Sequence, residues 1–201
     1  MKIASWQFAR SFFVSLTIWT LFSNTPAFCS TTLTLDLPEI SQKAEIIADV
    51  TVQNLTSYWA SPVGVKSIRT RVNFTVNQMV KGTPSPTLSL EFLGGQVGDR
   101  GLKVPGVPRF APGERYLIFS YAPDKAMVCP ILGFDQGALR IVHDDESNVN
   151  RVFRHWGQPV SEQQDFKSRM PATQGITTRE YLRSADTVDR FVERVRQSLN
   201  Q

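Results

Sequence analysis

The stretch SIRTRVNFTVNQMVKG, Ser67 to Gly82, decides the fold because its side chains alternate in kind from one residue to the next. Successive side chains of an extended chain point to opposite faces, so the pattern predicts a long, half-buried β-strand. A strand of this length needs neighbours on both sides and a sheet that curls over its apolar row, as in a small barrel. The more apolar row consists of Ile68, Thr70, Val72, Phe74, Val76, Gln78 and Val80.

Alternation and β-branched residues predict further strands on both sides of this stretch. Residues 57–66, with Pro62 and Gly64, are expected to form a loop that joins the first two strands into an antiparallel hairpin. Residues 94–113, rich in glycine and proline, are expected to be neither helix nor strand. Both faces of the strand at 114–121 are apolar, which predicts a place in the middle of the sheet. The other predicted strands cover 46–55, 87–93, 138–143 and 149–153, the last two joined by an acidic turn at 144–147.

A helix is predicted at each end of the strand region. Asp36 is the expected N-cap of a short helix that ends near Ala44. A second, amphipathic helix is predicted over 187–199, capped by Asp186 or Ser184. We expect its apolar stripe to dock on the barrel in cis, while its basic face offers the alternative of a partner-binding helix. The stripe consists of Val188, Phe191, Val192, Val195 and Leu199.

The first 29 residues have the pattern of a secretory signal peptide, because Lys2 and Arg10 precede a short apolar run and small polar residues follow it. An uncleaved anchor is the alternative, since the basic region is long. We expect a secreted or periplasmic protein that does not contact the membrane once the signal is removed. The predicted organisation is a signal peptide at 1–29, a β-barrel domain at 30–155, a linker at 156–177 and a C-terminal helical segment at 178–201.

The cleavage site decides the chemistry of the two cysteines. Cleavage after Ala27 retains Cys29, which is then able to form a disulfide with Cys129 in an oxidising compartment. Cleavage after Cys29 leaves Cys129 as a lone thiol. We favour a lone, buried Cys129, the common state of a structural cysteine.

The charge distribution argues against nucleic-acid binding. The net charge of +4 falls to +2 when Lys2 and Arg10 leave with the signal peptide, and the excess lies after residue 150. No segment interleaves dense basic and aromatic side chains, as a nucleic-acid interface requires. We expect instead a protein or glycan partner in the cell envelope.

Two segments carry a resemblance to known proteins. The strand that ends in Val80-Lys81-Gly82 precedes a Gly94-Gly95 loop, and the segment FAPGERYLIF at 110–119 follows it. The chain thereby resembles a family of exported bacterial proteins of unknown function and, more distantly, the netrin-like domains, which include the tissue inhibitors of metalloproteinases. The resemblance covers residues 38–155 and implies a five-stranded OB-type barrel. We therefore expect a mainly β protein, a small OB-like or netrin-like antiparallel barrel with a short N-terminal helix and a C-terminal amphipathic helix.

The sequence departs from the inhibitors at the position that carries their function. In those proteins a mature N-terminal cysteine grips the protease zinc, and here only cleavage after Phe28 exposes Cys29 at that position. Signal peptidases disfavour that cleavage. The dense disulfide framework of the inhibitors is also missing, so their inhibitory activity does not transfer to this chain. A protease-inhibitor-like module remains only as an alternative function, by analogy with the netrin-like barrels.

The glycine-rich segment holds the residues that we expect to bind a ligand. It lacks the Gly-Lys-Ser/Thr ending of a phosphate cradle and does not lead into a helix N-terminus. Arg100, Lys103 and Arg109 nevertheless place three cations on one long loop, which predicts a basic lip for a ligand.

The two histidines are the only candidates for metal or acid–base chemistry. His143 precedes Asp144, Asp145 and Glu146, a run that is most simply a solvated turn, because consecutive side chains point in different directions. We therefore predict a non-catalytic, extracytoplasmic binding or interaction module that uses no cofactor and no metal. The alternative is a secreted hydrolase or metal-dependent enzyme that uses His143 and His155.

Overall fold

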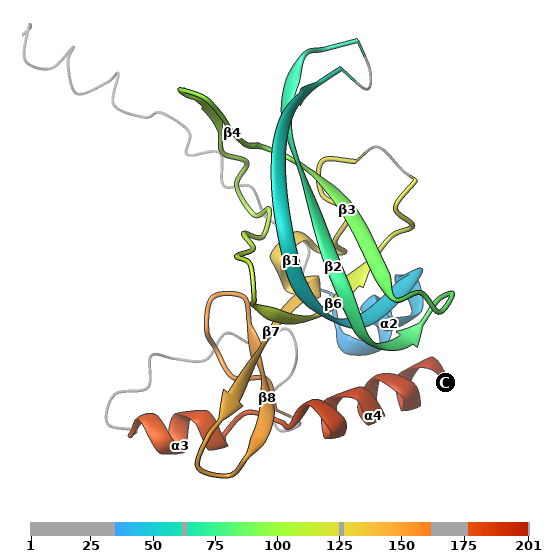
Figure 1. Ribbon diagram of the computed structural model, residues 1–201. Helices are drawn as coiled ribbons and strands as arrows, with labels where there is room; N and C mark the ends of the chain where they lie inside the picture. The colour runs from blue at the N-terminus through green and yellow to red at the C-terminus, as the bar shows by residue number, and fades with distance from the viewer. Residues whose placement is uncertain (1–34, 62–63, 125–126, 162–176, 201) are drawn as a thin grey trace, which may run out of the picture. The chain divides into compact units, whose positions relative to one another are not determined.

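The computed structural model describes residues 35–61, 64–124, 127–161 and 177–200 (Figure 1). This part of the chain is mainly β, as predicted, with a six-stranded sheet in the order β3-β2-β1-β6-β7-β8 and a two-stranded sheet of β4 and β5. All of these neighbouring strands pair antiparallel. The strands are β1 (Ile46–Ala60), β2 (Ser67–Lys81), β3 (Thr87–Leu93), β4 (Gly95–Val97), β5 (Arg100–Leu102), β6 (Arg115–Ser120), β7 (Ala138–Asp144) and β8 (Val149–Arg154). The helices are α2 (Leu37–Lys43), the 3-10 turn η1 (Phe134–Gly137), α3 (Thr178–Arg183) and α4 (Val188–Leu199).

The main sheet is buried on both faces at its centre. On β6, Leu117 and Phe119 belong to one apolar cluster, while Tyr116 and Ile118 belong to a second cluster on the other face. This division follows from the pleat of an extended strand. It confirms the prediction that the strand at 114–121 lies inside the sheet with both faces buried.

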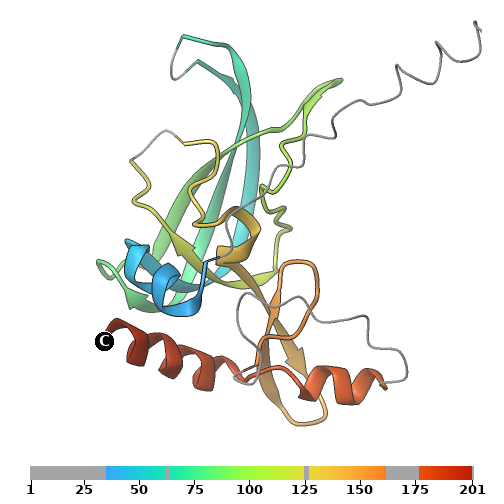
Figure 2. The same ribbon diagram turned by 180° about the vertical axis from the view of Figure 1, so that it is seen from behind.

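Helices cover the first of these clusters. The Asp36 side chain accepts the Glu39 N–H at 2.8 Å and caps α2, as predicted. The helix α4 lies beside α2 (Figure 2), with Val188, Phe191, Val192 and Val195 buried in the same cluster as the apolar face of α2. The prediction that the C-terminal helix docks in cis is confirmed.

Two loop predictions are wrong in part. The β1–β2 ladder continues through the pair Ala60–Ser67, so residues 57–60 are strand rather than loop. Backbone pairing with β2 stabilises these residues although their side chains do not alternate cleanly. The segment 94–113 contains the short hairpin β4–β5, in which Gly98 adopts a positive φ of 58° at the turn. Glycine favours that conformation, so the residue type that argued against strands here forms the turn between two of them.

The N-cap of α4 also differs from the prediction of Asp186 or Ser184. The Thr187 side chain accepts the Arg190 N–H and caps the helix. The Asp186 carboxylate instead pairs with Arg194, about two helical turns further on, at 2.6 Å. Its charge remains close to the helix N-terminus, where the helix dipole favours an anion.

The strands β3 and β8 are the two edges of the main sheet. Among the described residues no ladder joins them, so closure of the sheet into a barrel is not found. The β8 edge is covered, because the Val152 N–H donates to the Asp186 carbonyl and the Val160 N–H to the Val152 carbonyl, both at 3.0 Å. Val160, from the predicted linker, is buried against the sheet.

The predicted signal peptide, both candidate cleavage sites and Cys29 lie outside the described residues. Within the described ranges, none of the helices is both long enough and apolar enough to cross a membrane.

Candidate functional site

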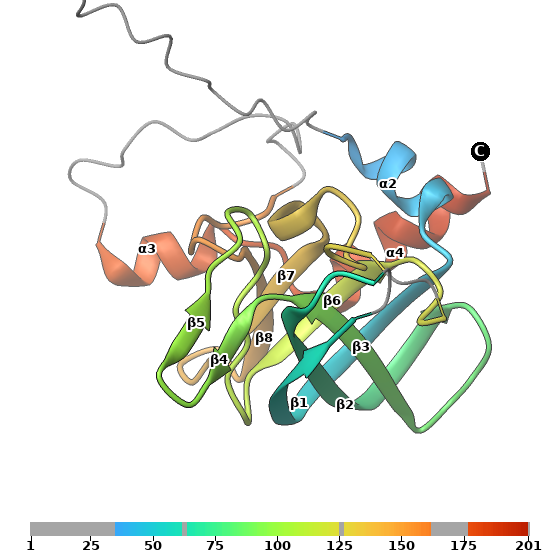
Figure 3. The ribbon, with the colours of Figure 1, turned by 90° about the horizontal axis from the view of Figure 1, so that it is seen from above.

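A groove of 780 Å³ lies between the curled end of β1, β2 and β3 and the segment 94–110. This volume is within the range of about 300–1,000 Å³ that is typical of ligand sites. The β4–β5 hairpin packs against β1 and β2 (Figure 3). Residues of both of its strands line one side of the groove. The apolar lining includes Leu55, Val72, Phe92, Val107 and Phe110, and the polar lining includes Ser57, Thr70, Lys103 and Arg109.

Aromatic packing fixes the inner wall of the groove. The Phe110 ring lies 5.0 to 5.4 Å, between centroids, from the rings of Tyr116, Phe92 and Phe74. Edge-on and tilted pairs at this distance stabilise one another beyond the apolar area that they bury. Phe110 therefore anchors the stretch 103–110 to the sheet, although this stretch contains no helix or strand.

Two hydroxyl groups fix the base of the β4–β5 hairpin. Ser57 Oγ and Thr70 Oγ1 are 2.8 Å apart, and the Thr70 hydroxyl donates to the Gly94 carbonyl at 2.7 Å. The Gln96 N–H donates to Ser57 Oγ at 3.4 Å. Gly95 lies directly over these hydroxyls, and an added Cβ there would overlap Thr70 Oγ1 and lie 2.5 Å from Ser57 Oγ.

Replacing Gly95 with alanine is expected to lower the free energy of unfolding by about 1–3 kcal/mol, because its φ of 128° strains any residue with a Cβ. Urea unfolding measures the change. Gly101→Ala is the matched control: its φ is ordinary and its Cβ would meet only the Gly95 carbonyl oxygen, at 3.8 Å. Equal losses in the two variants would contradict a strain specific to Gly95, whether it comes from the positive φ or from the close approach to the two hydroxyls.

His155 ties the far rim of the groove to the sheet. The Arg109 backbone N–H donates to His155 Nε2 at 3.3 Å, and the imidazole stacks on Tyr116 with centroids 6.2 Å apart. Burial lowers the pKa of His155, which outweighs the opposing effect of the nearby Asp135 and Glu114. An Nε2 atom that accepts a hydrogen bond carries no proton, so this geometry requires the neutral imidazole.

Acidification is therefore expected to weaken the fold at the groove rim. Below the ordinary histidine pKa of 6.5, the unfolded chain takes up a proton at His155 that the folded chain resists. The free energy of unfolding then falls as the pH falls through 6.5, and the stability is fully retained well above that range. Urea unfolding at a series of pH values tests this.

His155→Gln keeps an acceptor for the Arg109 N–H and removes the titration, so its stability curve is expected to be flatter over the same window. Exposed His143 is present in both proteins and cancels in the comparison. Identical slopes for wild type and variant would show that His155 is not the responsible group.

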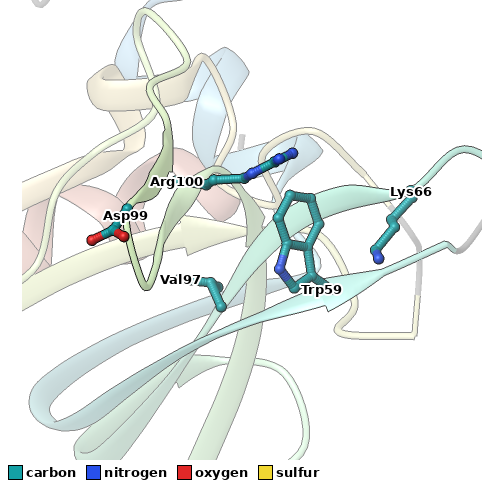
Figure 4. Close-up of a pocket in the computed structure, with 5 residues that line it drawn as sticks. All are labelled: Trp59, Lys66, Val97, Asp99 and Arg100. Atoms are coloured by element: carbon teal, nitrogen blue, oxygen red, sulfur yellow. The ribbon is translucent and has the colours of Figure 1, made fainter.

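The three predicted binding residues do not lie together. Lys103 and Arg109 line the groove, whereas Arg100 lines a neighbouring depression of 650 Å³ with Trp59, Lys66, Val97 and Asp99. In that depression Arg100 and Lys66 flank the Trp59 ring (Figure 4), and the Lys66 ammonium lies 5.1 Å from the ring centroid. Trp59 is 39% exposed, so the depression is an open surface.

The predicted acidic turn is only partly solvated. Asp144 is 4% exposed, accepts hydrogen bonds from Ser147 and from Arg151, and its pKa lies below the usual range because of them. Glu146 pairs with Arg179 at 2.7 Å, which joins the turn to α3. These partners make the acidic run a structural element of the β7–β8 hairpin.

The two histidines have separate environments. His143 is exposed and hydrogen-bonds to Asn150 at 3.1 Å across the β7–β8 hairpin, while His155 contacts the groove rim. Among the described residues, no group of three His, Cys, Asp or Glu side chains is placed to hold a metal ion.

Cys129 is a buried, free thiol in the part of the chain that the structure describes, as predicted for this residue. Burial raises its pKa to about 12, so the thiolate that reactive cysteines need does not form at neutral pH.

Known proteins provide no further assignment for these features. No model of a protein family matches the sequence, and a search of curated proteins finds no match.

Proposed function

We propose that this chain is a non-catalytic binding module, secreted or periplasmic, that holds a component of the cell envelope in the groove beside β4 and β5. The observation that carries the proposal is a 780 Å³ groove with an apolar lining and a few polar groups at its edge. A mostly apolar lining with a few polar groups is typical of ligand-binding sites.

The fold fits this role as an OB-like or netrin-like module. The supporting feature is the curled three-stranded unit β3-β2-β1, which continues through β1 into β6 and β7. Folds of this type bind ligands on the concave face of their strands and in the adjoining loops. In this chain residues of three strands and of the segment that follows β3 line the groove, which supports the comparison.

A groove-filling substitution tests the proposal. Gly101 lines the groove and has room for a side chain, so Gly101→Phe is expected to remove binding of the purified protein to a cell-envelope fraction. Asp145→Phe places the same ring on the distant β7–β8 turn, where the side chain is 97% exposed, and controls for non-specific adhesion. Retained binding in the Gly101 variant would place the interaction elsewhere on the protein.

A further inference from the structure

The two cations that line the groove, Lys103 and Arg109, have no acidic partner among the described residues. Elsewhere in the described chain, arginines pair with carboxylates, as in Arg115–Asp49, Arg140–Glu114 and Arg151–Asp144. Lys103 and Arg109 are exposed, and within the described residues neither forms an ion pair or a side-chain hydrogen bond to a protein group.

The groove itself contains no acid. Neither aspartate nor glutamate occurs among its lining residues, whereas two cations do. A concave surface with charge of one sign over walls of low dielectric raises the local concentration of ions of the opposite sign. The charge at the groove edge therefore selects for an anion.

The floor selects for an apolar body. The apolar surface that a ligand can reach belongs to the half-buried Leu55, Val107 and Phe110, which pack on the buried Val72 and Phe92 beneath them. The hydroxyls of Ser57 and Thr70 are already engaged with each other and with the hairpin backbone. A sugar would leave most of its hydroxyls without partners on this floor, which costs free energy, whereas a hydrocarbon chain gains by leaving water.

We propose that the groove binds an amphipathic anion, an alkyl or acyl chain that carries a phosphate or carboxylate head group. The chain lies on the apolar floor formed by Leu55, Val107 and Phe110, and the head group faces Lys103 and Arg109. Both cations suit such a head group, since guanidinium and ammonium donate charge-assisted hydrogen bonds to its oxygens. This inference rests on the proposed binding function and names the class of ligand for the same groove.

Three probes separate the contributions of the chain and the charge. Dodecyl phosphate, below its micelle concentration, is expected to bind the whole protein saturably with one site in calorimetry. Dodecyl maltoside has the same chain without the charge and is expected to bind at least about tenfold more weakly. Inorganic phosphate alone is expected to show no binding, because it has no apolar body to bury. Equal affinity for the two dodecyl probes would overturn the proposal.

Two matched double variants assign the charge to the groove. Lys103→Gln with Arg109→Gln is expected to weaken dodecyl phosphate binding about tenfold and to leave dodecyl maltoside unchanged. Lys66→Gln with Arg100→Gln removes the same charge from the neighbouring depression. This change is expected to alter binding less than about twofold, because salt screens the interaction of these more distant charges with the head group. A loss that is equal in both pairs contradicts a head-group site at Lys103 and Arg109.

The outcome also separates this inference from the function on which it rests. If neither dodecyl probe binds while the envelope fraction still binds wild type and not Gly101→Phe, the ligand class is wrong and the groove remains the binding site. If the envelope fraction fails to bind as well, both proposals fail. Circular dichroism of each variant, unchanged from wild type, establishes that the comparisons are made between folded proteins.

Discussion

Replacing Phe191 with alanine is expected to lower the free energy of unfolding by about 3–5 kcal/mol. The Phe191 side chain is fully buried in the cluster that α4 shares with α2 and the sheet. Truncation removes the apolar area of the ring and leaves a cavity, because close-packed neighbours relax only in part. Equilibrium unfolding in urea measures the change, and the midpoint is expected to shift while the slope stays close to that of wild type.

The control lies on the opposite face of the same helix. Gln197 is exposed, so Gln197→Ala is expected to change stability by less than about 0.5 kcal/mol. A small loss at Phe191 would mean that α4 does not contribute to the core, and it would contradict docking of the helix in cis.

The periodicity of the sequence was sufficient to locate α4 and the main strands. Val188, Phe191, Val192 and Val195 recur at helical spacing, and all four are buried. The alternation of β2 likewise identified its buried face from Val72 to Val76. Beyond Val76 the prediction is wrong, because irregularities in the β1–β2 pairing put Met79 against this cluster and Val80 against the cluster on the other face. Elsewhere these predictions succeeded because they depend on local geometry, in which the spacing of apolar residues directly reports the face that is buried.

The groove was not predictable in the same way. Its lining combines residues from β1, β2, β3 and the segment beyond them, so no local window contains it. Ser57 and Thr70 carry no chemical signature, and their role depends on the close approach of Gly94 and Gly95 from another part of the chain. Such approaches are set by packing between elements, and spacing along the sequence does not report them.

The separation of Arg100 from Lys103 was not predictable from the sequence either. Grouping the three cations by their distance along the chain treats 94–113 as one loop, but the segment contains β4 and β5. Arg100 begins β5 and lines the neighbouring depression, whereas Gly101, Leu102 and Lys103 all line the groove. Three consecutive residues on one surface do not follow the alternation of a strand, so the packing of the hairpin on the sheet sets this division.

Replacing Asp49 with alanine is expected to lower the free energy of unfolding by about 2–4 kcal/mol. Asp49 lies within the apolar strand β1, is 1% exposed, and accepts hydrogen bonds from Arg115 Nε at 2.8 Å and from Asn77 at 2.9 Å. Removing the carboxylate leaves the Arg115 guanidinium without its counter-charge. That side chain is 34% exposed, so water compensates part of the loss and the expected cost is below that of a fully buried pair.

A double substitution separates two costs of Asp49→Ala, namely the Arg115 charge left without a counter-charge and the packing that is lost. Asp49→Ala combined with Arg115→Met removes both charges, and it is expected to recover about half of the stability that Asp49→Ala loses, because no uncompensated cation remains. Urea unfolding of the wild type, the two single variants and the double variant gives the coupling energy between the two side chains. If the two single losses simply add in the double variant, the pair does not interact, and the cost at Asp49 comes from its hydrogen bond to Asn77 and from the cavity that alanine leaves.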